Sequence, residues 1–200
     1  MLIEGLTFAY AKTVIFENFG FDSESSIITL RGPSGCGKST LLKLLAGYYK
    51  PINVSTWNIP EQSRIILQED ALFPWLTGEA NLTLFCKEKY SSAHIESHPM
   101  FAICRDVLTK RASEMSFGQR RLVELFRCFL TPTPLICLDE PLNFLDKDKR
   151  ASVAEIIKQD ISKHSHLVMS THYPEDNALL DCESYEFDGN FPVTALRRRA

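Results

Sequence analysis

The chain has 200 residues, the length of one domain or of one domain that carries an added lobe. Its 22 basic and 25 acidic residues give a formal charge of −3, which excludes a nucleic-acid binder that relies on bulk positive charge. Apolar residues make up 44% of the chain, which suits a real core, and no apolar run approaches the roughly 18 residues of a membrane span. The six cysteines are scattered without a CxxC pair, so we expect reduced thiols and no zinc site, and the N-terminal residues predict no secretory signal.

Strand-like and helix-like segments alternate along the chain, and this alternation predicts an α/β fold. Aromatic, β-branched and short apolar runs predict strands at 2–10, 13–21, 26–31, 63–68, 135–138, 166–170 and 184–187. Helical spacing predicts helices at 39–47, 118–130, 146–162 and 175–180. The stretch 77–110 is also helical in pattern, so we predict one domain over 1–200, in which a helical lobe (77–130) is inserted into an α/β core (1–76 and 131–200).

A glycine-rich turn lies between the predicted strand 26–31 and the predicted helix 39–47. It fits the pattern G-x-x-x-x-G-K-[ST] and consists of Gly32, Pro33, Ser34, Gly35, Cys36, Gly37, Lys38, Ser39 and Thr40. Between a strand and a helix, such a turn directs backbone N–H groups at phosphate oxygens, next to the positive end of the helix dipole. We expect Lys38 to reach the β- and γ-phosphates of ATP and the Ser39 hydroxyl to bind Mg²⁺. The same surroundings favour a reactive thiolate at Cys36 that ATP would protect, and a chance glycine-rich turn remains the alternative.

An acidic pair follows the apolar run 135–138. Such a run is typical of a buried parallel strand, and it would deliver Asp139 to the carboxyl edge of the sheet, where ligands bind in open α/β folds. We expect Asp139 to hold Mg²⁺ and Glu140 to polarise a water molecule for attack on the γ-phosphate. The alternative is an Asp-Glu pair that only begins a turn before Pro141.

Five further motifs, in this order and spacing, resemble those of the ATP-binding subunit of an ATP-binding cassette (ABC) transporter. Met115-Ser116-Phe117-Gly118-Gln119 resembles the LSGGQ signature, and Gln68 ends a predicted strand as the Q-loop glutamine does. Asn143-Phe144-Leu145-Asp146 resembles the D-loop, and Ser170-Thr171-His172 resembles the H-loop. Tyr10 lies near the position of the family's adenine-stacking aromatic residue, and the resemblance extends from about 2 to 189.

The resemblance implies a P-loop NTPase fold: a RecA-like core sheet, a small antiparallel β part and an inserted helical lobe. It implies an ATPase that forms a head-to-tail homodimer, with ATP held between the phosphate loop of one copy and the signature of the other. Hydrolysis would then loosen the two copies. Ser116 and the Gly118 backbone would donate to the γ-phosphate held by the other copy, and Gln119 and Asp146 would also bind nucleotide.

The resemblance also assigns roles within one copy. His172 would contact the γ-phosphate and the attacking water, Gln68 would bind Mg²⁺ and the water, and Tyr10 would stack on adenine. The alternative for Tyr10 is a core position, with Phe8 as a competitor for stacking, and we expect Phe8 on the opposite face of the strand.

Gln68–Asn81 contains the run Leu72-Phe73-Pro74-Trp75 and is similar to the nitrate, sulfonate and taurine group of importer ATPases. This similarity implies contact with transmembrane permease subunits at the cytoplasmic face of the inner or plasma membrane. A solute-binding protein would act indirectly, and nucleic acid would not be a partner. The sequence thus predicts an ATPase that powers import of a small solute.

Three departures from the family pattern bear on these expectations. Phe117 replaces the usual first glycine of the signature, and Cys182 replaces the usual arginine after Asp181. The segment between Lys38 and Gln68 is short, so we expect a trimmed antiparallel β part and an effect on nucleotide affinity. Two alternatives to a transport ATPase remain. One is a nucleotide-dependent binding or regulatory module with weak turnover, and the other is an ABC ATPase without a role in transport.

Two histidines and a run of arginines lie outside these motifs. His94 and His98 have helical spacing that could bind a metal ion, but we expect solvated side chains because Pro99 follows and no third ligand is evident. We expect Arg197–Arg199 to form a frayed tail.

Overall fold

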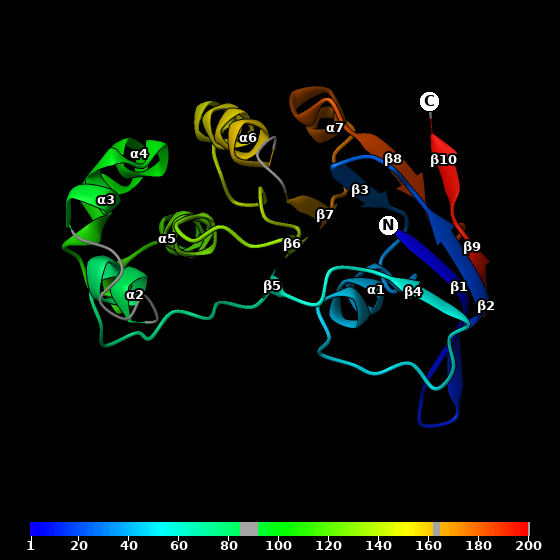
Figure 1. Cartoon of the computed structure of the whole chain (residues 1–200). Coiled ribbons are helices and arrows are strands. Elements are labelled where there is room, and N and C mark those ends of the chain that lie inside the picture. Colours follow the sequence, from blue (N-terminus) through cyan, green and yellow to red (C-terminus); the bar gives the residue numbers. More distant parts are fainter. Residues whose placement is uncertain (85–91, 162–164, 200) are drawn as a thin grey trace.

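In the computed structural model, the protein is described over residues 1–84, 92–161 and 165–199. Its centre is a six-stranded sheet with the strand order β10-β8-β3-β7-β6-β5 (Figure 1). The strands are β3 (Ile27–Arg31), β5 (Ser63–Ile66), β6 (Leu135–Asp139), β7 (His166–Ser170), β8 (Glu183–Glu186) and β10 (Arg197–Arg199). All neighbouring pairs are parallel except β10 and β8. The predicted α/β fold is confirmed.

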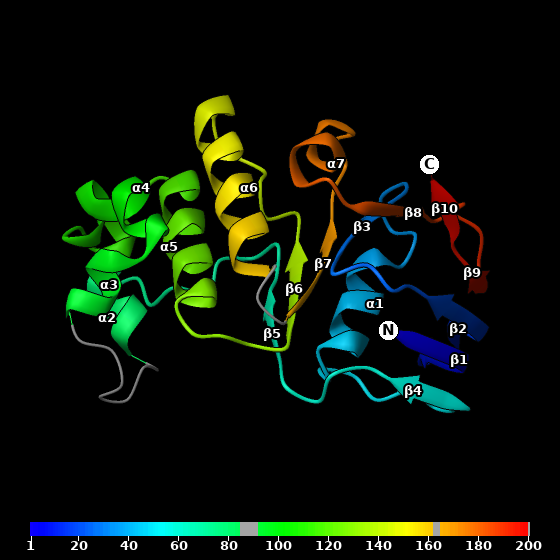
Figure 2. The ribbon, with the colours of Figure 1, turned by 45° about the horizontal axis from the view of Figure 1, so that its top comes forward.

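Both faces of this sheet are covered, which explains why β6 is apolar throughout. Leu135 and Cys137 pack into one core cluster, which includes leucines of α1 (Lys38–Leu45) and residues of a second sheet. Ile136 and Leu138 point to the opposite face and pack into a cluster with α5 (Phe117–Phe129), α6 (Lys147–Ile161) and α7 (Glu175–Leu180). Figure 2 shows α1 on one side of the core strands and α5 and α6 on the other.

The second sheet is small and has the strand order β4-β1-β2-β9. Its strands are β1 (Leu2–Tyr10), β2 (Thr13–Asp22), β4 (Thr56–Asn58) and β9 (Val193–Ala195). β1 and β2 form the predicted antiparallel pair, whereas β4 and β9, with three residues each, carry too short a pattern for sequence analysis to detect. The short β4 agrees with the expected trimming of this part.

The expectation of a frayed C-terminal tail is wrong. β10 pairs antiparallel with β8 at the edge of the central sheet. Arg198 forms an ion pair with Glu183, and Arg199 with Glu186. The arginine run therefore covers a sheet edge with charged side chains, which is a common way to protect an edge strand.

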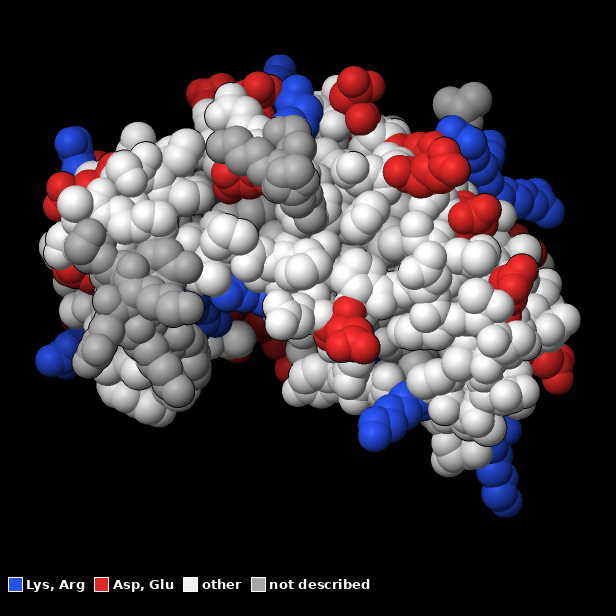
Figure 3. All heavy atoms as spheres, in the orientation of Figure 1, with Lys and Arg blue, Asp and Glu red and all other residues white. Residues whose placement is uncertain are grey.

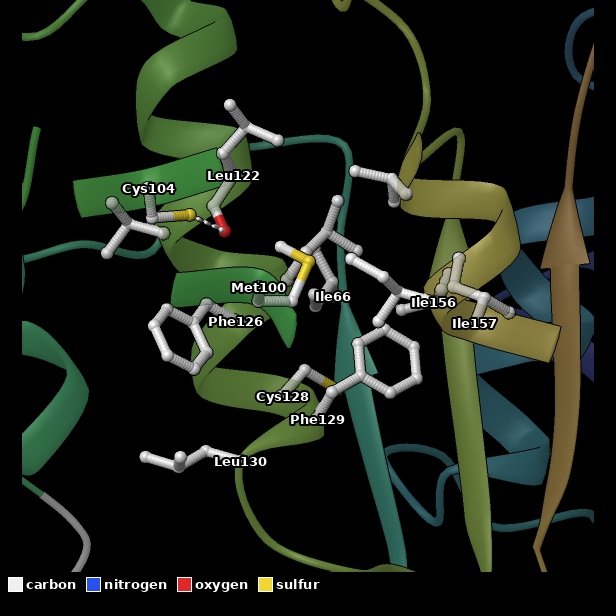
Figure 4. Packing of buried hydrophobic residues seen from close by; sticks show 14 of the residues in the cluster. Ile66, Met100, Cys104, Leu122, Phe126, Cys128, Phe129, Leu130, Ile156 and Ile157 are labelled. Atoms are coloured by element: carbon white, nitrogen blue, oxygen red, sulfur yellow. Dashed lines mark hydrogen bonds between the residues drawn. The ribbon is translucent and has the colours of Figure 1, made fainter. Parts of the chain in front are cut away.

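Helices occupy the region 77–130. They are α2 (Gly78–Thr83), α3 (Ser92–Ser97), α4 (Pro99–Leu108), the 3₁₀ turn η1 (Ala112–Glu114) and α5 (Phe117–Phe129). Residues 85–91 of the predicted lobe lie outside the described residues. Figure 4 shows apolar side chains of α4, α5, β5 and α6 in one cluster, where the Cys104 thiol donates to the Leu122 carbonyl. The division into core and lobe stays a prediction.

The expectation of a solvated side chain is wrong for His98. Its Nδ1 accepts the Met100 N–H at 3.1 Å and so caps α4, and its Nε2 lies 3.4 Å from Asp160 Oδ2, with 11% of the side chain exposed. His94 is exposed. Among the described residues, no group of three His, Cys, Asp or Glu side chains could hold a metal ion.

The surface carries charges of both signs. On the face shown in Figure 3, acidic and basic side chains are interspersed and neither sign forms an extended patch. In the described parts of the chain, no helix is both long enough and apolar enough to span a bilayer.

Candidate functional site

Four parallel strands of the central sheet lead into one pocket at their carboxyl edge. β3 leads into the glycine-rich turn, β5 into Gln68, β6 into Glu140 and β7 into His172. The pocket has a volume of about 140 Å³ and is lined by Ser34, Gly35, Gly37, Lys38, Ser39, Thr40, Gln68, Glu140 and His172. Residues that are far apart in the sequence, and that sequence analysis singled out separately, therefore meet at one place.

The glycine-rich turn presents donors to this pocket. Gly37 precedes α1 with a φ of 108°, a left-handed conformation that favours glycine, and among the described residues no side chain caps this helix. The first N–H groups of α1 therefore remain available, next to the positive end of its dipole. The buried Lys38 Nζ donates to the Gly32 and Pro33 carbonyls, at 2.9 Å each, and so ties the turn together.

The side chain of Cys36 is buried, although its position suggested an accessible, reactive thiol. Only 2% of the residue is exposed, and its Sγ lies 3.7 Å from Lys38 Nζ inside the turn. The fold therefore shields this thiol in the nucleotide-free protein, and its protection by ATP stays a prediction.

The acidic pair is held by residues whose roles sequence analysis did not assign. Ser170 Oγ donates to Asp139 Oδ1 at 2.5 Å and accepts the Glu140 N–H at 2.9 Å. Asp139 is buried and lies outside the set of pocket-lining residues. Ser170 belongs to the motif Ser170-Thr171-His172, but sequence analysis gave it no role. Its hydroxyl at the end of a buried strand could have indicated a contact with the acidic pair.

Glu140 is fixed on both carboxylate oxygens. Its φ is 51°, an unfavourable left-handed value for a residue with a side chain, and such strain concentrates at functional sites. Asn143 Nδ2 donates to Oε2 at 2.5 Å, and His172 Nε2 lies 2.8 Å from Oε1. The carboxylate is thus oriented from two sides while it borders the pocket.

The segment after β5 is clamped to α5 by a buried ion pair. Arg121 donates to the carbonyls of Leu67 (2.9 Å) and Gln68 (2.7 Å), and its Nη1 lies 3.0 Å from Glu124 Oε2. Glu124 also accepts the Ala71 N–H at 2.6 Å. Burial raises the pKa of the Glu124 carboxyl, and Arg121 opposes that shift. Neither residue was predicted from the sequence, although an Arg and a Glu at i,i+3 on an apolar helix face were a usable signal.

The signature residues lie elsewhere and serve the local structure. Ser116 and Gln119 form a reciprocal capping box: Ser116 Oγ accepts the Gln119 N–H and Gln119 Oε1 accepts the Ser116 N–H. Asp146 accepts the Lys149 N–H at 2.9 Å at the start of α6, and Lys149 Nζ lies 2.7 Å from its second oxygen. In the described part of the chain, the pocket is lined by none of Ser116, Gly118, Gln119 and Asp146.

Tyr10 lies beside the start of α1. Its hydroxyl is 3.4 Å from Thr40 Oγ1, and 39% of the residue is exposed. Its ring contacts those of Phe8 and Tyr49, with centroids 5.0 and 5.5 Å apart. The expectation that Phe8 faces the opposite side is wrong, because residues two apart on a strand share a face. Phe8 is buried, so Tyr10 is the more accessible of the two rings.

The segment that follows Gln68 exposes a large aromatic side chain. Trp75 is 66% exposed, and its ring centroid lies 5.4 Å from that of Phe73. The fully buried Asn81 holds this loop: its Oδ1 accepts the Phe73 N–H, and its Nδ2 donates to the Phe73 and Thr77 carbonyls. A rigid loop that carries an exposed Trp is typical of a protein-binding surface.

Comparisons with known proteins point to one family. A family model described as ABC transporter matches residues 18–143. The thiamine import ATP-binding protein ThiQ of Vibrio cholerae is 33% identical, with 80% of this chain and 75% of ThiQ covered. The cytochrome c biogenesis ATP-binding export protein CcmA of Paracoccus denitrificans is 32% identical, with 86% and 80% covered.

Solved structures share the fold. The ATP-binding subunit of an ABC transporter aligns with a TM-score of 0.83 at 21% identity, over 100% of this chain and 89% of that chain. The ATP-binding cassette MJ0796, solved as a dimer in a post-hydrolysis state bound to ADP and Pi, aligns with a TM-score of 0.78 at 17% identity, over 99% and 97%.

Proposed function

Because this chain belongs to the ABC transporter family and is an ATPase of that family, we propose that the pocket at its carboxyl sheet edge hydrolyses ATP to power a membrane importer. The observation that carries the proposal is the oriented Glu140 carboxylate in the same pocket as Lys38 and the start of α1. A general base and a phosphate-binding helix terminus are the two parts that ATP hydrolysis requires.

The turn and α1 bind the phosphates. The free N–H groups at the start of α1 donate to phosphate oxygens, and Lys38 neutralises charge on the β- and γ-phosphates. Its ammonium is already desolvated and held by two carbonyls, so it loses little freedom when the phosphates bind. Tyr10, the accessible ring beside Thr40, stacks on adenine.

The side chains proposed for Mg²⁺ are Ser39, Gln68 and Asp139. All three offer oxygen atoms, the donors that Mg²⁺ prefers, and Ser39 and Gln68 line the pocket. When bound, Mg²⁺ supplies neutralisation of the charge that develops on the phosphates. Ser170 holds the Asp139 carboxylate in one orientation.

Glu140 acts on the attacking water. Its carboxylate accepts the water's proton as the oxygen approaches the γ-phosphate, and Asn143 and His172 keep both carboxylate oxygens in place. Each carboxylate oxygen has two lone pairs, so one contact per oxygen leaves capacity for the water.

A second copy completes the site. Ser116, Gly118, Gln119 and Asp146 lie outside the pocket of their own chain, and Ser116 and Asp146 are exposed. The N-terminus of α5 would therefore meet the γ-phosphate held by the partner copy, again at a helix terminus. That MJ0796 was solved as a dimer supports this arrangement.

The exposed Trp75 on the Asn81-braced loop is our candidate contact for the permease, at the cytoplasmic face of the membrane. We favour import of a small solute because several relatives are thiamine importers, although CcmA is named an export protein. Neither ThiQ nor CcmA is named for nitrate, sulfonate or taurine, so that subgroup stays a prediction.

The proposal is tested by ATP hydrolysis of purified wild type and Glu140→Gln, with the mass of the particle followed by light scattering in ATP. We expect Glu140→Gln to lose about 10²- to 10⁴-fold in turnover, the usual contribution of a general base, and to persist as a dimer in ATP. Glu155→Gln, an exposed carboxylate on α6, serves as the matched control and should keep wild-type turnover. Binding without Glu140-dependent turnover would support a nucleotide-dependent binding module.

A further inference from the structure

Two phenylalanines join the first turn of α5 to the loop after β6. The rings of Phe117 and Phe144 meet edge to face, with centroids 4.5 Å apart. The backbones are also close, because a Cβ added to Gly118 would lie 2.5 Å from the Phe144 carbonyl oxygen. Phe117 stands where the resembled motif has glycine, so this ring contact is a property of this chain.

The Phe117 ring also contacts the clamp on the Gln68 segment. The guanidinium carbon of Arg121, one helical turn further on, lies 5.7 Å from the Phe117 centroid, within the range of a cation–π interaction. Arg121 is 1% exposed and donates to the Gln68 carbonyl. Within the part of the chain that the structure describes, its Nε finds no hydrogen-bond partner, so the ring face adds to the two carbonyls and Glu124, which compensate the charge on Nη1 and Nη2.

At the other end, the loop that carries Phe144 also holds the proposed general base. Asn143, the residue before Phe144, donates to Glu140 Oε2 at 2.5 Å. A continuous series of contacts thus runs from Glu140 through Asn143 and the two rings to Arg121 and the Gln68 backbone. Both of its ends line the same pocket.

We propose that Phe117 is a positioning residue for ATP hydrolysis, whose ring couples the Glu140 loop to the Gln68 segment within one chain. The inference rests on the proposed function of the pocket. Without the ring, Phe144 loses its edge-to-face contact and Arg121 loses its cation–π contact. The Glu140 loop and the Gln68 segment are then no longer connected through Phe117. The nucleotide-binding turn is untouched by this change.

The kinetic test compares Phe117→Ala, Phe144→Ala and their double variant. We expect each single variant to lower kcat about tenfold with little change in KM for ATP, and the double variant to be no worse than the poorer single one. Phe117→Tyr keeps the ring and should keep wild-type kcat. Phe101→Ala removes an aromatic side chain packed on the core in α4 and controls for a general loss of stability. Additive losses, or equal losses in kcat for Phe101→Ala, would overturn the proposal.

A second test needs no ATP turnover and separates this proposal from the proposed function. Amide hydrogen exchange of the nucleotide-free protein should speed up in both 67–71 and 140–146 when Phe144 is replaced by alanine. Faster exchange confined to 140–146 would show that the ring pair does not couple the segments, whether or not the protein is an ATPase.

A third measurement separates a role within the chain from a role in dimer contact. Phe117→Ala, added to Glu140→Gln, should form the ATP-dependent dimer as readily as Glu140→Gln alone. Loss of that dimer would instead assign the rings to contact with the second copy and overturn the proposal.

Discussion

The pocket at the sheet edge and the start of α5 differ in how many of the hydrogen bonds and ion pairs of their functional side chains come from the same chain. In the pocket, Lys38 has two carbonyl partners and Glu140 has contacts on both oxygens, so the geometry is set before any ligand arrives. At the start of α5, the side chains of Ser116 and Gln119 each accept the backbone N–H of the other residue, and neither side chain lines the pocket. The contrast fits the proposed function, in which one chain preorganises phosphate binding and water activation and the signature meets ATP held by a second copy.

Of the substitutions in the two regions, Lys38→Ala in the pocket should have the largest effect, which is a loss of ATP affinity. Loss of charge-assisted hydrogen bonds to the phosphates should weaken ATP binding by about 100-fold, equivalent to roughly 3 kcal/mol. Isothermal titration with a non-hydrolysable ATP analogue measures the change. Lys158→Ala, which removes a partly exposed lysine on α6, should bind like wild type. Similar losses in both variants would mean that the pocket is not the phosphate site.

A smaller effect is expected at the start of α5. Ser116→Ala removes the N-cap of α5 and should lower the free energy of unfolding by about 1 kcal/mol. Because Ser116 does not line the pocket of its own chain, binding of ATP to the monomer should stay unchanged. Denaturant unfolding and analogue titration at low protein concentration measure the two quantities. A large loss of ATP affinity in monomeric Ser116→Ala would contradict the conclusion that the start of α5 does not bind the nucleotide of its own chain.

The smallest effect is expected for Glu124, whose side chain connects α5 to the Gln68 segment, and it is a change in how the free energy of unfolding depends on pH. Burial raises the pKa of its carboxyl, so the folded protein holds this proton more tightly than the unfolded chain does. The resulting stability is present below about pH 4.5 and is lost as the pH rises through the raised pKa. Wild type should therefore lose free energy of unfolding relative to Glu124→Gln as the pH rises above about 4.5.

The control for that experiment is Glu155→Gln. Lys158 lowers the pKa of the exposed Glu155 carboxyl. The difference in free energy of unfolding between wild type and Glu155→Gln should therefore change in the opposite direction, with wild type losing stability as the pH falls. Unfolding by urea at several pH values gives both slopes. The same sign for both variants would contradict the conclusion that burial raises the pKa of the Glu124 carboxyl.

The long elements and the pocket could be predicted from the sequence because their signals are local. The apolar run of β6 and the strand–turn–helix around Lys38 each specify their structure within about ten residues. β10 was missed because its three arginines have no strand pattern, and only pairing with Glu183 and Glu186 makes them an edge strand.

The partners that position the site could not be derived in the same way. Asn143 and Ser170 contact Glu140 across a loop and across neighbouring strands, and these contacts exist only once the sheet has formed. His98 was expected to be solvated because Pro99 follows and no third metal ligand is evident, whereas it is the half-buried N-cap of the helix that begins at Pro99. Tertiary packing decided these cases, and no window of the sequence contains that information.

The most direct test of a site shared between two copies is to mix two inactive variants. Lys38→Ala disables phosphate binding and Ser116→Arg blocks the signature, so each homodimer lacks both sites. In a mixed dimer, one of the two sites combines an intact turn with an intact signature. An equimolar mixture should recover up to about a quarter of wild-type ATP turnover, since random pairing makes half of the dimers mixed. No recovery, with both variants folded and Ser116→Arg still able to bind ATP, would contradict the shared site, as would full turnover by Ser116→Arg alone.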